Sequence, residues 1–420
     1  MKPYATFFSS RSFFVALIIS FLLLAAICPA TAAASSTKPE AADGLTEYVT
    51  AKNDAQTRSG FDHYYELDYD AAIRDFQAAM QAHPRDPYAV NHLLAAVFFK
   101  ELYKAGALES NAYASNSFLS NHTQIHLDSA TDARIKELIG RAMDLASKRL
   151  SENSNDAKAY YARGVAHGME STYTALVQKG WFAALGDAKA ARQDHEKALE
   201  LAPDFSDARL VVGMHSYIVG SLPWPIRVLA HVVGESGNRS TGIRDLYAAA
   251  EGGGDASVDA KVVLALFLRR EHRYSEALAL EHNLAGTHSR NFLFAVEEAN
   301  ILKDSGDPAG SIAAYRRVLT KAQGGGFQDP QLEFAFYGLA EVLRGQHDFA
   351  GAAEAYSSAA NLAHANPQIR LRAQLAAGEM YDLLQQRELA IKMYRSVITA
   401  DASSEEAATA REGLKEPYRN

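Results

Sequence analysis

The chain has 420 residues, of which 48% are hydrophobic and 22% charged, and its net charge at neutral pH is −8. These values are ordinary for a folded protein, and the length allows two or three compact domains or one long array of repeats. The negative charge argues against nucleic acid and anionic membranes as partners, because both repel an acidic surface.

The N-terminus has the layout of a secretory signal peptide over residues 1–32. Two basic residues precede an apolar run, residues 13–28, and Ala30-Thr31-Ala32 then supplies the small-residue pattern that a signal peptidase cleaves. We therefore expect an exported chain, cleaved near Ala32, in the periplasm or outer envelope of a bacterium.

Two alternatives stay open for this segment. An uncleaved anchor is disfavoured because the apolar run is shorter than the roughly 20 residues that a bilayer core requires. A lipoprotein signal would use Cys28 as its modified residue, but Ile27 stands before it, where a small residue is needed.

Cleavage would change both the charge and the redox chemistry. Lys2 and Arg11 would leave without any acidic residue, so 40 basic residues would face 50 acidic ones and the net charge would become −10. Cys28 is the single cysteine, so the mature chain would have neither a disulfide nor thiol chemistry. Residues 33–50 are rich in Ala, Ser, Thr and Glu, which predicts a flexible mature N-terminus.

A recurring spacing marks the first predicted pair of helices. Ala72, Phe76 and Ala79 place a small, an aromatic and a small residue along one helix. Gly60 lies twelve positions before Ala72, where crossing helices leave room only for small side chains. Pro84 ends the second helix, because its ring cannot continue the hydrogen-bond ladder.

The residues from Pro87 to Lys104 predict the next helix, after which regularity fails over residues 105–130. This polar stretch contains His122 and His126, four positions apart. No third ligand is evident nearby, so a solvated pair is favoured over a metal site.

Regular helices resume with Ser129 and Asp132, which predict a capped helix start. In the following unit Gly164 and Ala191 are 27 positions apart instead of 12. Fifteen residues are therefore inserted there, by a longer first helix and an added turn. His195 stands at the position that Phe76 occupies in the first pair.

Residues 205–256 form a divergent module. Pro223 and Pro225 interrupt its helices, and an apolar segment follows over residues 226–233. Trp224 is either an anchor for a partner or a side chain that covers the core where the helix breaks. We favour the second interpretation.

The spacing becomes regular over residues 257–402, and residues 403–420 predict a capping helix and tail. The small residues separated by twelve positions are Ala265 and Ala277, Ala299 and Ser311, Ala340 and Ala352, and Gly378 and Ala390.

These spacings resemble the tetratricopeptide repeat family, most clearly over residues 53–84 and 257–402. The resemblance implies an all-α fold, a right-handed solenoid of about seven or eight helix–turn–helix pairs with irregular insertions in the middle. Residues 51–204 would then hold N-terminal units with an insertion. His195 and Glu281 depart from the pattern, because the family has an aromatic residue at both positions.

A second resemblance covers part of the divergent module. Ser221-Leu222-Pro223 and Gly237-Asn238 resemble a segment of fungal inclusion-body-clearance proteins and their animal tetratricopeptide relatives, which are implicated in lipid-associated clearance. The alternative is an independent elaboration with no shared role.

No catalytic signature is found in the sequence. It lacks a phosphate-binding Gly-rich loop, a paired-histidine zinc helix and, after cleavage, a cysteine nucleophile. The glycines of Gly234-Glu-Ser-Gly237 have the wrong spacing for a nucleophile elbow, so this segment is predicted as a turn. We expect no enzymatic activity, no cofactor and no metal.

In tetratricopeptide repeats the first helices line the ligand groove, so the resemblance also implies groove positions in this chain. A carboxylate clamp is not expected, because Val296 stands where such a clamp has a lysine. The partner-binding candidates are Arg269, Asn300, Lys303, Tyr337, Arg344 and Arg372 in the groove, together with Trp224.

The sequence thus predicts a non-catalytic, exported scaffold that binds a partner protein or peptide in the concave groove of a tetratricopeptide superhelix. Nucleic acid is not expected as a partner. The less favoured alternative is a membrane- or lipid-associated envelope factor that acts through residues 206–254.

Overall fold

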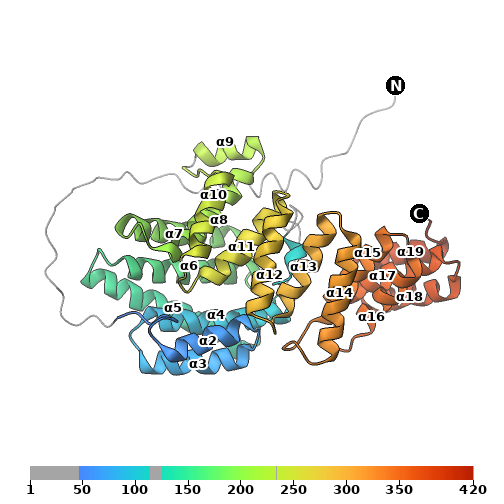
Figure 1. Ribbon diagram of the computed structural model, residues 1–420, viewed down its shortest axis with the longest axis horizontal. Coiled ribbons are helices and arrows are strands. Elements are labelled where there is room, and N and C mark those ends of the chain that lie inside the picture. Colours follow the sequence, from blue (N-terminus) through green and yellow to red (C-terminus); the bar gives the residue numbers. More distant parts are fainter. Residues whose placement is uncertain (1–46, 114–124, 233, 420) are drawn as a thin grey trace. The chain divides into compact units, whose positions relative to one another are not determined.

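The computed structural model describes residues 47–113, 125–232 and 234–419, and within these ranges all regular elements are helices (Figure 1). The expected signal peptide and His122 lie outside the described residues. The α-helices are α2 (Ala55–Tyr65), α3 (Tyr69–Ala82), α4 (Pro87–Lys104), α5 (Ser129–Glu152), α6 (Ala157–Leu176), α7 (Trp181–Leu201), α8 (Arg209–Ser221), α9 (Trp224–Val232), α10 (Arg239–Glu251), α11 (Ser257–Arg270), α12 (Tyr274–Thr287), α13 (Phe292–Asp304), α14 (Pro308–Gln323), α15 (Leu332–Gly345), α16 (Phe349–Asn361), α17 (Pro367–Leu383), α18 (Arg387–Ala400) and α19 (Glu405–Lys415). Two short 3-10 helices are η1 (Ser110–Ala112) and η3 (Ser206–Ala208).

Consecutive helices pack as pairs joined by short turns. Helix α6 packs against α7, α8 against α10, α13 against α14, α15 against α16, and α17 against α18. Helix α9 is inserted between the two helices of one pair. The preceding helix ends at Ser221, before Pro223, as expected, whereas Pro225 lies in the first turn of α9. The all-α prediction is confirmed for the described residues.

The same turn recurs inside six helix pairs. Two positions before the second helix of each pair, the backbone enters the left-handed region, which suits glycine and strains other residues. Only one of the six is a glycine. These residues are Leu67 (φ 64°), Lys179 (φ 58°), His272 (φ 59°), Gly306 (φ 83°), His347 (φ 59°) and Gln385 (φ 60°).

The small residues predicted at helix crossings lie directly against aromatic rings. A Cβ atom on Gly60 would stand 2.5 Å from the ring of Phe76, and one on Gly378 would stand 2.6 Å from the ring of Tyr394. Both rings are only 1% exposed, so neither can easily move aside. The predicted spacing of small and aromatic residues is therefore confirmed at these crossings.

The two residues that replace an aromatic are also buried. His195 is 1% exposed and lies against Gly164, where its Nδ1 is 2.7 Å from the carbonyl oxygen of Ala191. Burial lowers the pKa of His195 to about 4, so the imidazole is neutral in the folded chain. Glu281 is 2% exposed, and burial raises the pKa of its carboxyl group well above the usual range.

Two sequence expectations need correction. The insertion beyond Gly164 lengthens both helices of its pair, since α6 has 20 residues and α7 has 21. Helix α5 is capped by Asp128 instead of Ser129, because the Asp128 carboxylate accepts hydrogen bonds from the backbone N–H groups of Ala130 and Thr131.

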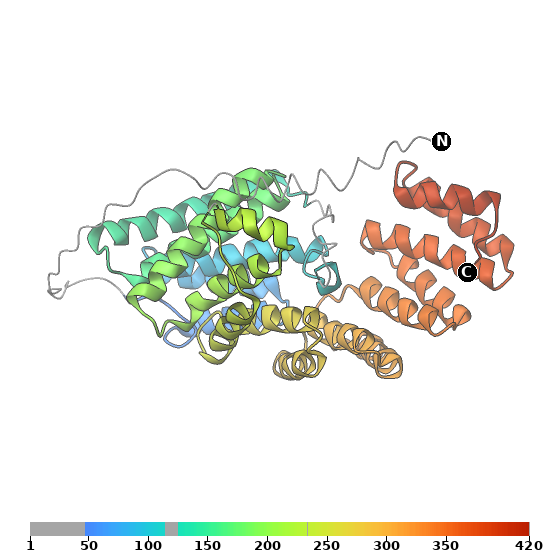
Figure 2. The same ribbon diagram turned by 90° about the horizontal axis from the view of Figure 1, so that it is seen from above.

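The chain divides into two compact units that interleave along the sequence. The first comprises the described residues within 1–61, 72–98 and 124–264, and the second those within 62–71, 99–123 and 265–420. In the second unit the side-chain amide of Asn291 donates to the carbonyl oxygen of Tyr65 over 2.7 Å. Figure 2 shows the orange and red helices of this unit, α15 to α19, stacked in chain order.

Candidate functional site

The candidate site is the face formed by the first helices of the C-terminal repeats, α13, α15, α17 and the end of α11; we call it the first-helix face. The structure buries two of its predicted residues, since Arg269 is 3% exposed and Asn300 is 0% exposed. The expectation that both residues line an open groove is wrong. Residues 103–113 of the same chain, here called the cis segment, hydrogen-bond to both of them.

One end of the cis segment is held through its main chain. Gln331 donates to the carbonyl oxygen of Tyr103 over 2.7 Å, and Asn366 donates to that of Ala105 over 3.1 Å. Gly106 has a φ of 70°, and a Cβ atom there would stand 2.7 Å from the ring of Phe334 on α15. Only glycine therefore allows both the turn and the close approach.

The other end is held mainly through side chains. Asn111 donates to Oδ1 of Asn300 over 2.9 Å and accepts from Arg269 over 2.7 Å. Ser110 donates to Glu297 on α13, and Arg270 donates to the carbonyl oxygen of Tyr113 over 2.9 Å. The cis segment thus contacts α15, α13 and α11 in succession.

Buried carboxyl groups surround the Arg269 guanidinium. Arg269 pairs with Glu297 at 3.0 Å and donates from Nε to Asp304 over 2.7 Å. Burial, and then the charge of Glu297, raises the pKa of Glu109 to about 7. The same two causes raise the pKa of Glu281, and Oε2 of Glu281 is buried without a hydrogen-bond partner. The acids thus outnumber the nearby cations, Arg269 and Lys303, which favours the protonated form of the least compensated acids.

The far end of the first-helix face is covered by the C-terminal residues. Arg344 pairs with Glu379 at 3.1 Å and donates to the hydroxyl oxygen of Tyr418 over 3.0 Å. The backbone N–H of Tyr418 donates to Asp382 over 2.8 Å, and Arg387 donates to the carbonyl oxygen of Leu414. Arg344 is therefore engaged within the chain.

Four predicted groove residues keep exposed surface, and one of them is Arg344, whose side chain is 32% exposed. The side chain of Lys303 is 32% exposed, 3.8 Å from Asp304, and that of Arg372 is 51% exposed, 3.4 Å from Glu406. Tyr337 is half-buried, with its ring centroid 5.4 Å from that of Tyr356. These residues form the part of the first-helix face that solvent reaches.

Trp224 lies in the first unit and does not cover the core. It is 72% exposed, so the favoured expectation for this side chain is wrong. The reason is that α9 buries Ile226, which is 6% exposed, and turns Trp224 and Val228 outward.

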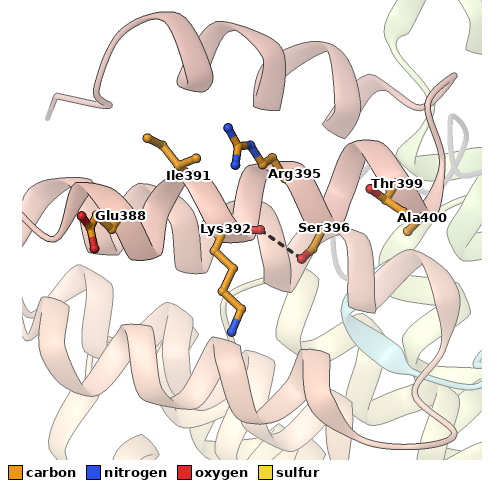
Figure 3. A pocket seen from close by; sticks show the side chains of 7 residues that line it. All are labelled: Glu388, Ile391, Lys392, Arg395, Ser396, Thr399 and Ala400. Carbon is orange, nitrogen blue, oxygen red and sulfur yellow. Dashed lines mark hydrogen bonds between the residues drawn. The ribbon is translucent and has the colours of Figure 1, made fainter.

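Two hollows lie in the second unit, and the larger of these two is formed by one helix. One, of about 480 Å³, is lined by residues of α18 alone, from Glu388 to Ala400 (Figure 3). Another, of about 370 Å³, lies beside Tyr394 and Tyr418. An active site usually draws convergent polar groups from several elements, which a single helix does not supply.

The sequence did not single out Glu109, Ser110, Asn111 or Tyr418 as residues of this face. The one available signal was the loss of helical periodicity after Lys104, which marks an irregular segment without saying where it packs.

Helix pairs with a shared left-handed turn, crossing where a small residue meets a buried ring, define the architecture. The chain has a tetratricopeptide-type fold. No family model and no curated protein matches it. Within the described residues, no helix combines the length and the apolar composition needed to cross a membrane.

Solved structures give similarity in fold. The chain is similar to one in the APC/C hetero-tetramer Cut9–Hcn1, with 12% identity, a TM-score of 0.47, and coverage of 87% of this chain and 56% of that chain. It therefore spans little more than half of that relative. The C-terminal part of a TPR repeat-containing protein from Cytophaga hutchinsonii gives 13% identity, a TM-score of 0.45, and coverage of 66% and 95%. PilF of Pseudomonas aeruginosa gives 14% identity, a TM-score of 0.38, and coverage of 62% and 99%.

Proposed function

We propose that this chain is a non-catalytic scaffold that binds a segment of a partner protein along the first-helix face. The observation that carries the proposal is the cis segment itself. This face already holds an irregular stretch of chain, through hydrogen bonds from Gln331, Asn366 and Arg270 to main-chain carbonyl oxygens. Donors of this kind accept many sequences, as a peptide-binding surface requires.

The partner would first meet the exposed part of the face. Lys303 and Arg372 offer charged donors there, and Tyr337 offers a half-buried ring. Arg and Lys form strong hydrogen bonds with carboxylates, so we expect an acidic segment as the ligand. Since the donors stand on packed helices, little ordering would accompany binding.

Removing the exposed cations tests this proposal. The variant K303Q/R372Q should lose the partner that the wild-type chain captures from the cell envelope, whereas R316Q/R395Q should retain it. The control removes the same charge from exposed positions on second helices, α14 and α18. Equal recovery by the two variants would contradict the assignment of the first-helix face.

We further infer that the chain is exported, on the strength of its first 32 residues. Mass spectrometry of the chain isolated from the envelope fraction should find a mature N-terminus at Ala33. A chain that retains Met1 and stays in the cytoplasm would contradict export.

A second candidate function uses the divergent module. Trp224 and Val228 are 72% and 54% exposed on a short helix, which is a composition that also suits the surface of a lipid bilayer. With W181F, Trp224 becomes the only tryptophan. Its fluorescence should shift to shorter wavelength with vesicles of phosphatidylcholine and phosphatidylglycerol if this function holds. An unchanged spectrum would exclude it and leave the scaffold.

A further inference from the structure

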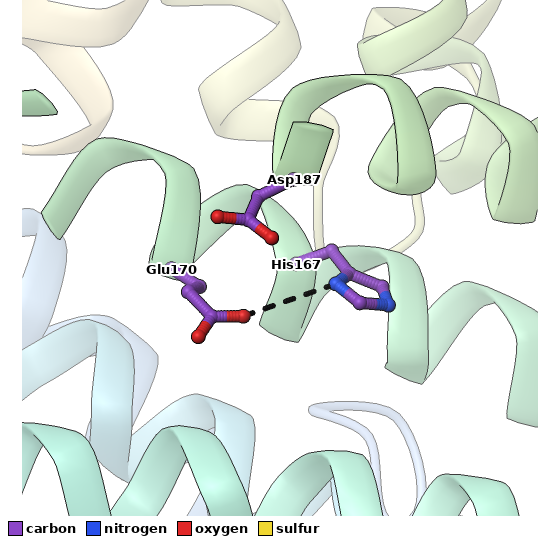
Figure 4. A group of neighbouring side chains, drawn as sticks. All are labelled: His167, Glu170 and Asp187. Carbon is purple, nitrogen blue, oxygen red and sulfur yellow. Dashed lines mark ion pairs between the residues drawn. The ribbon is translucent and has the colours of Figure 1, made fainter. Parts of the chain in front are cut away.

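Three potential metal ligands converge between α6 and α7 of the first unit. His167 and Glu170 lie one helical turn apart on α6, and Asp187 lies on α7. One potential ligand atom from each lies within 4.8 Å of the other two. Figure 4 shows the two carboxylates and the imidazole around a common space.

The backbone around this cluster is fixed on both sides. Toward one end of the helix pair, a Cβ atom on Gly164 would stand 3.1 Å from the carbonyl oxygen of Ala191. Toward the other end, the Ser171 hydroxyl donates to the carbonyl oxygen of Ala184 over 2.7 Å. The three side chains therefore project from rigid helices, which is the support that a metal site needs.

The polar groups of the cluster are poorly satisfied by the protein. The Nδ1 atom of His167 is buried and has no hydrogen-bond partner, and the nearest oxygen of Glu170 is 4.0 Å away. Among the ion pairs of the described residues, neither Glu170 nor Asp187 meets a lysine or an arginine. Two carboxylates and an imidazole nitrogen without a hydrogen-bond partner thus surround one space. A cation bound there would stabilise this arrangement.

Both carboxyl groups of the cluster have raised pKa values, although the charge of His167 acts in the opposite sense. Burial raises the pKa of Glu170, and the nearby charge of Asp187 raises it further. Burial likewise raises the pKa of Asp187. A divalent cation would reverse both effects by favouring the ionised carboxylates.

We propose that His167, Glu170 and Asp187 bind a divalent transition metal ion, with Zn²⁺ as the best fit and water completing the coordination. One imidazole nitrogen and two carboxylate oxygens form a donor set that Zn²⁺ accepts at about 2 Å from each atom. The acidic side chains are part-exposed and can close the remaining distance. The neighbouring glycines do not crowd these side chains, since even a Cβ atom on Gly168 or Gly186 would meet nothing within 4 Å. The ion would join the two helices and stabilise the first unit.

The test uses the full mature chain without an affinity tag, freed of metal by a chelator and titrated calorimetrically with Zn²⁺. We expect one equivalent to bind to the wild type, and binding at least ten times weaker to E170Q/D187N. These substitutions keep the shape of the side chains and remove their charge. The thermal unfolding midpoint should rise with Zn²⁺ in the wild type and stay constant in the variant.

The matched control is H83A, which removes a histidine that lies 3.8 Å from the carboxylate of Asp54, far from the cluster in the sequence. It should bind Zn²⁺ like the wild type. Absence of a one-equivalent site in the wild type, or equal affinity in E170Q/D187N, would overturn the proposal. If the double variant does not fold, H167Q alone decides, with the same expected loss of binding.

Discussion

The side-chain amide of Asn111 donates to Oδ1 of Asn300 over 2.9 Å, although 189 positions separate the two residues along the chain. Oδ1 of Asn111 in turn accepts from Arg269 over 2.7 Å. Asn300 is 0% exposed, so water cannot take the place of its partner without the cis segment moving away. The cis segment is thus a structural part of the second unit and, under the proposed function, a competitor for its ligand.

Replacing Asn111 by alanine should lower the free energy of unfolding. Arg269 and Asn300 would each lose one hydrogen bond while staying buried, although Arg269 keeps Asp304 as a partner and Asn300 keeps Tyr315. One buried hydrogen bond contributes about 0.5–1.5 kcal/mol. Urea unfolding should therefore show a loss of about 1–3 kcal/mol for the two bonds together. The exposed Asn283→Ala serves as control and should change stability by less than about 0.5 kcal/mol. Equal midpoints for the two variants would mean that the cis segment is not held as described.

Weakening the cis segment should make the first-helix face available to the same sequence in trans. A fluorescent peptide with the sequence of residues 103–113 should bind S110A/N111A and not the wild type, because the wild-type site is filled intramolecularly at high effective concentration. Fluorescence anisotropy measures this binding, and a scrambled peptide is the control. Failure to bind S110A/N111A would count against a peptide-receptive face.

The raised pKa of Glu109, about 7, makes stability depend on pH. At acidic pH, below the ordinary carboxyl range, both the folded and the unfolded chain are protonated. As pH rises toward 7, the unfolded chain releases a proton that the folded chain keeps, so unfolding becomes more favourable. Above pH 7 no further change arises from this group.

Substituting Glu109→Gln removes that dependence. Between pH 4.5 and pH 7.5 the wild type should lose up to about 3 kcal/mol more stability than the variant. Glu281 titrates in the same direction in both proteins, so the difference between the two urea-unfolding curves isolates Glu109. Parallel pH profiles would show that burial does not hold Glu109 protonated.

The recurring left-handed turn predicts a stabilising change. Gln385 has a φ of 60°, a conformation that costs a side-chain-bearing residue about 1 kcal/mol relative to glycine. Gln385→Gly should therefore raise the unfolding free energy by about 0.5–1 kcal/mol. At the equivalent turn Gly306, with a φ of 83°, the substitution Gly306→Ala should act in the opposite sense. Thermal unfolding of both variants checks the pair.

Glycine-to-alanine substitutions should have opposite effects on stability at helix crossings and on exposed helix surface. Gly60→Ala would place a methyl group 2.5 Å from the buried ring of Phe76 and should cost about 1–3 kcal/mol. Gly140→Ala on α5 would meet nothing within 4 Å and should gain up to about 1 kcal/mol, because alanine favours the helix. Changes of the same sign in both variants would contradict the close crossing.

The sequence predicts local relationships well and distant ones poorly. The contact between Gly378 and Tyr394 follows from spacing within one repeat, and the structure confirms it. The contact between Asn111 and Asn300 joins an irregular segment to a distant helix, and no periodic pattern encodes such a pairing. For the same reason, the sequence could predict that Arg269 lies on the first-helix face but could not predict that the cis segment buries it.

Trp224 illustrates a second limit of prediction from sequence, which concerns the burial of a single side chain. A proline-bounded tryptophan has the same local sequence whether it covers a core or faces water, because its burial depends on which side of a short helix meets the neighbouring ones. In α9 that side carries Ile226, and the tryptophan is left outside.

The second unit is assembled from separate stretches of the sequence, so its parts are synthesised at different times. Tyr65 leaves the ribosome 226 residues before Asn291, whose side chain binds its carbonyl oxygen. Helices from α13 onward therefore complete contacts with residues that were synthesised much earlier. A recombinant fragment that begins at Ala265 would lack both early pieces, so Arg269, Asn291 and Asn300 would lose the contacts that residues 62–71 and 99–123 supply.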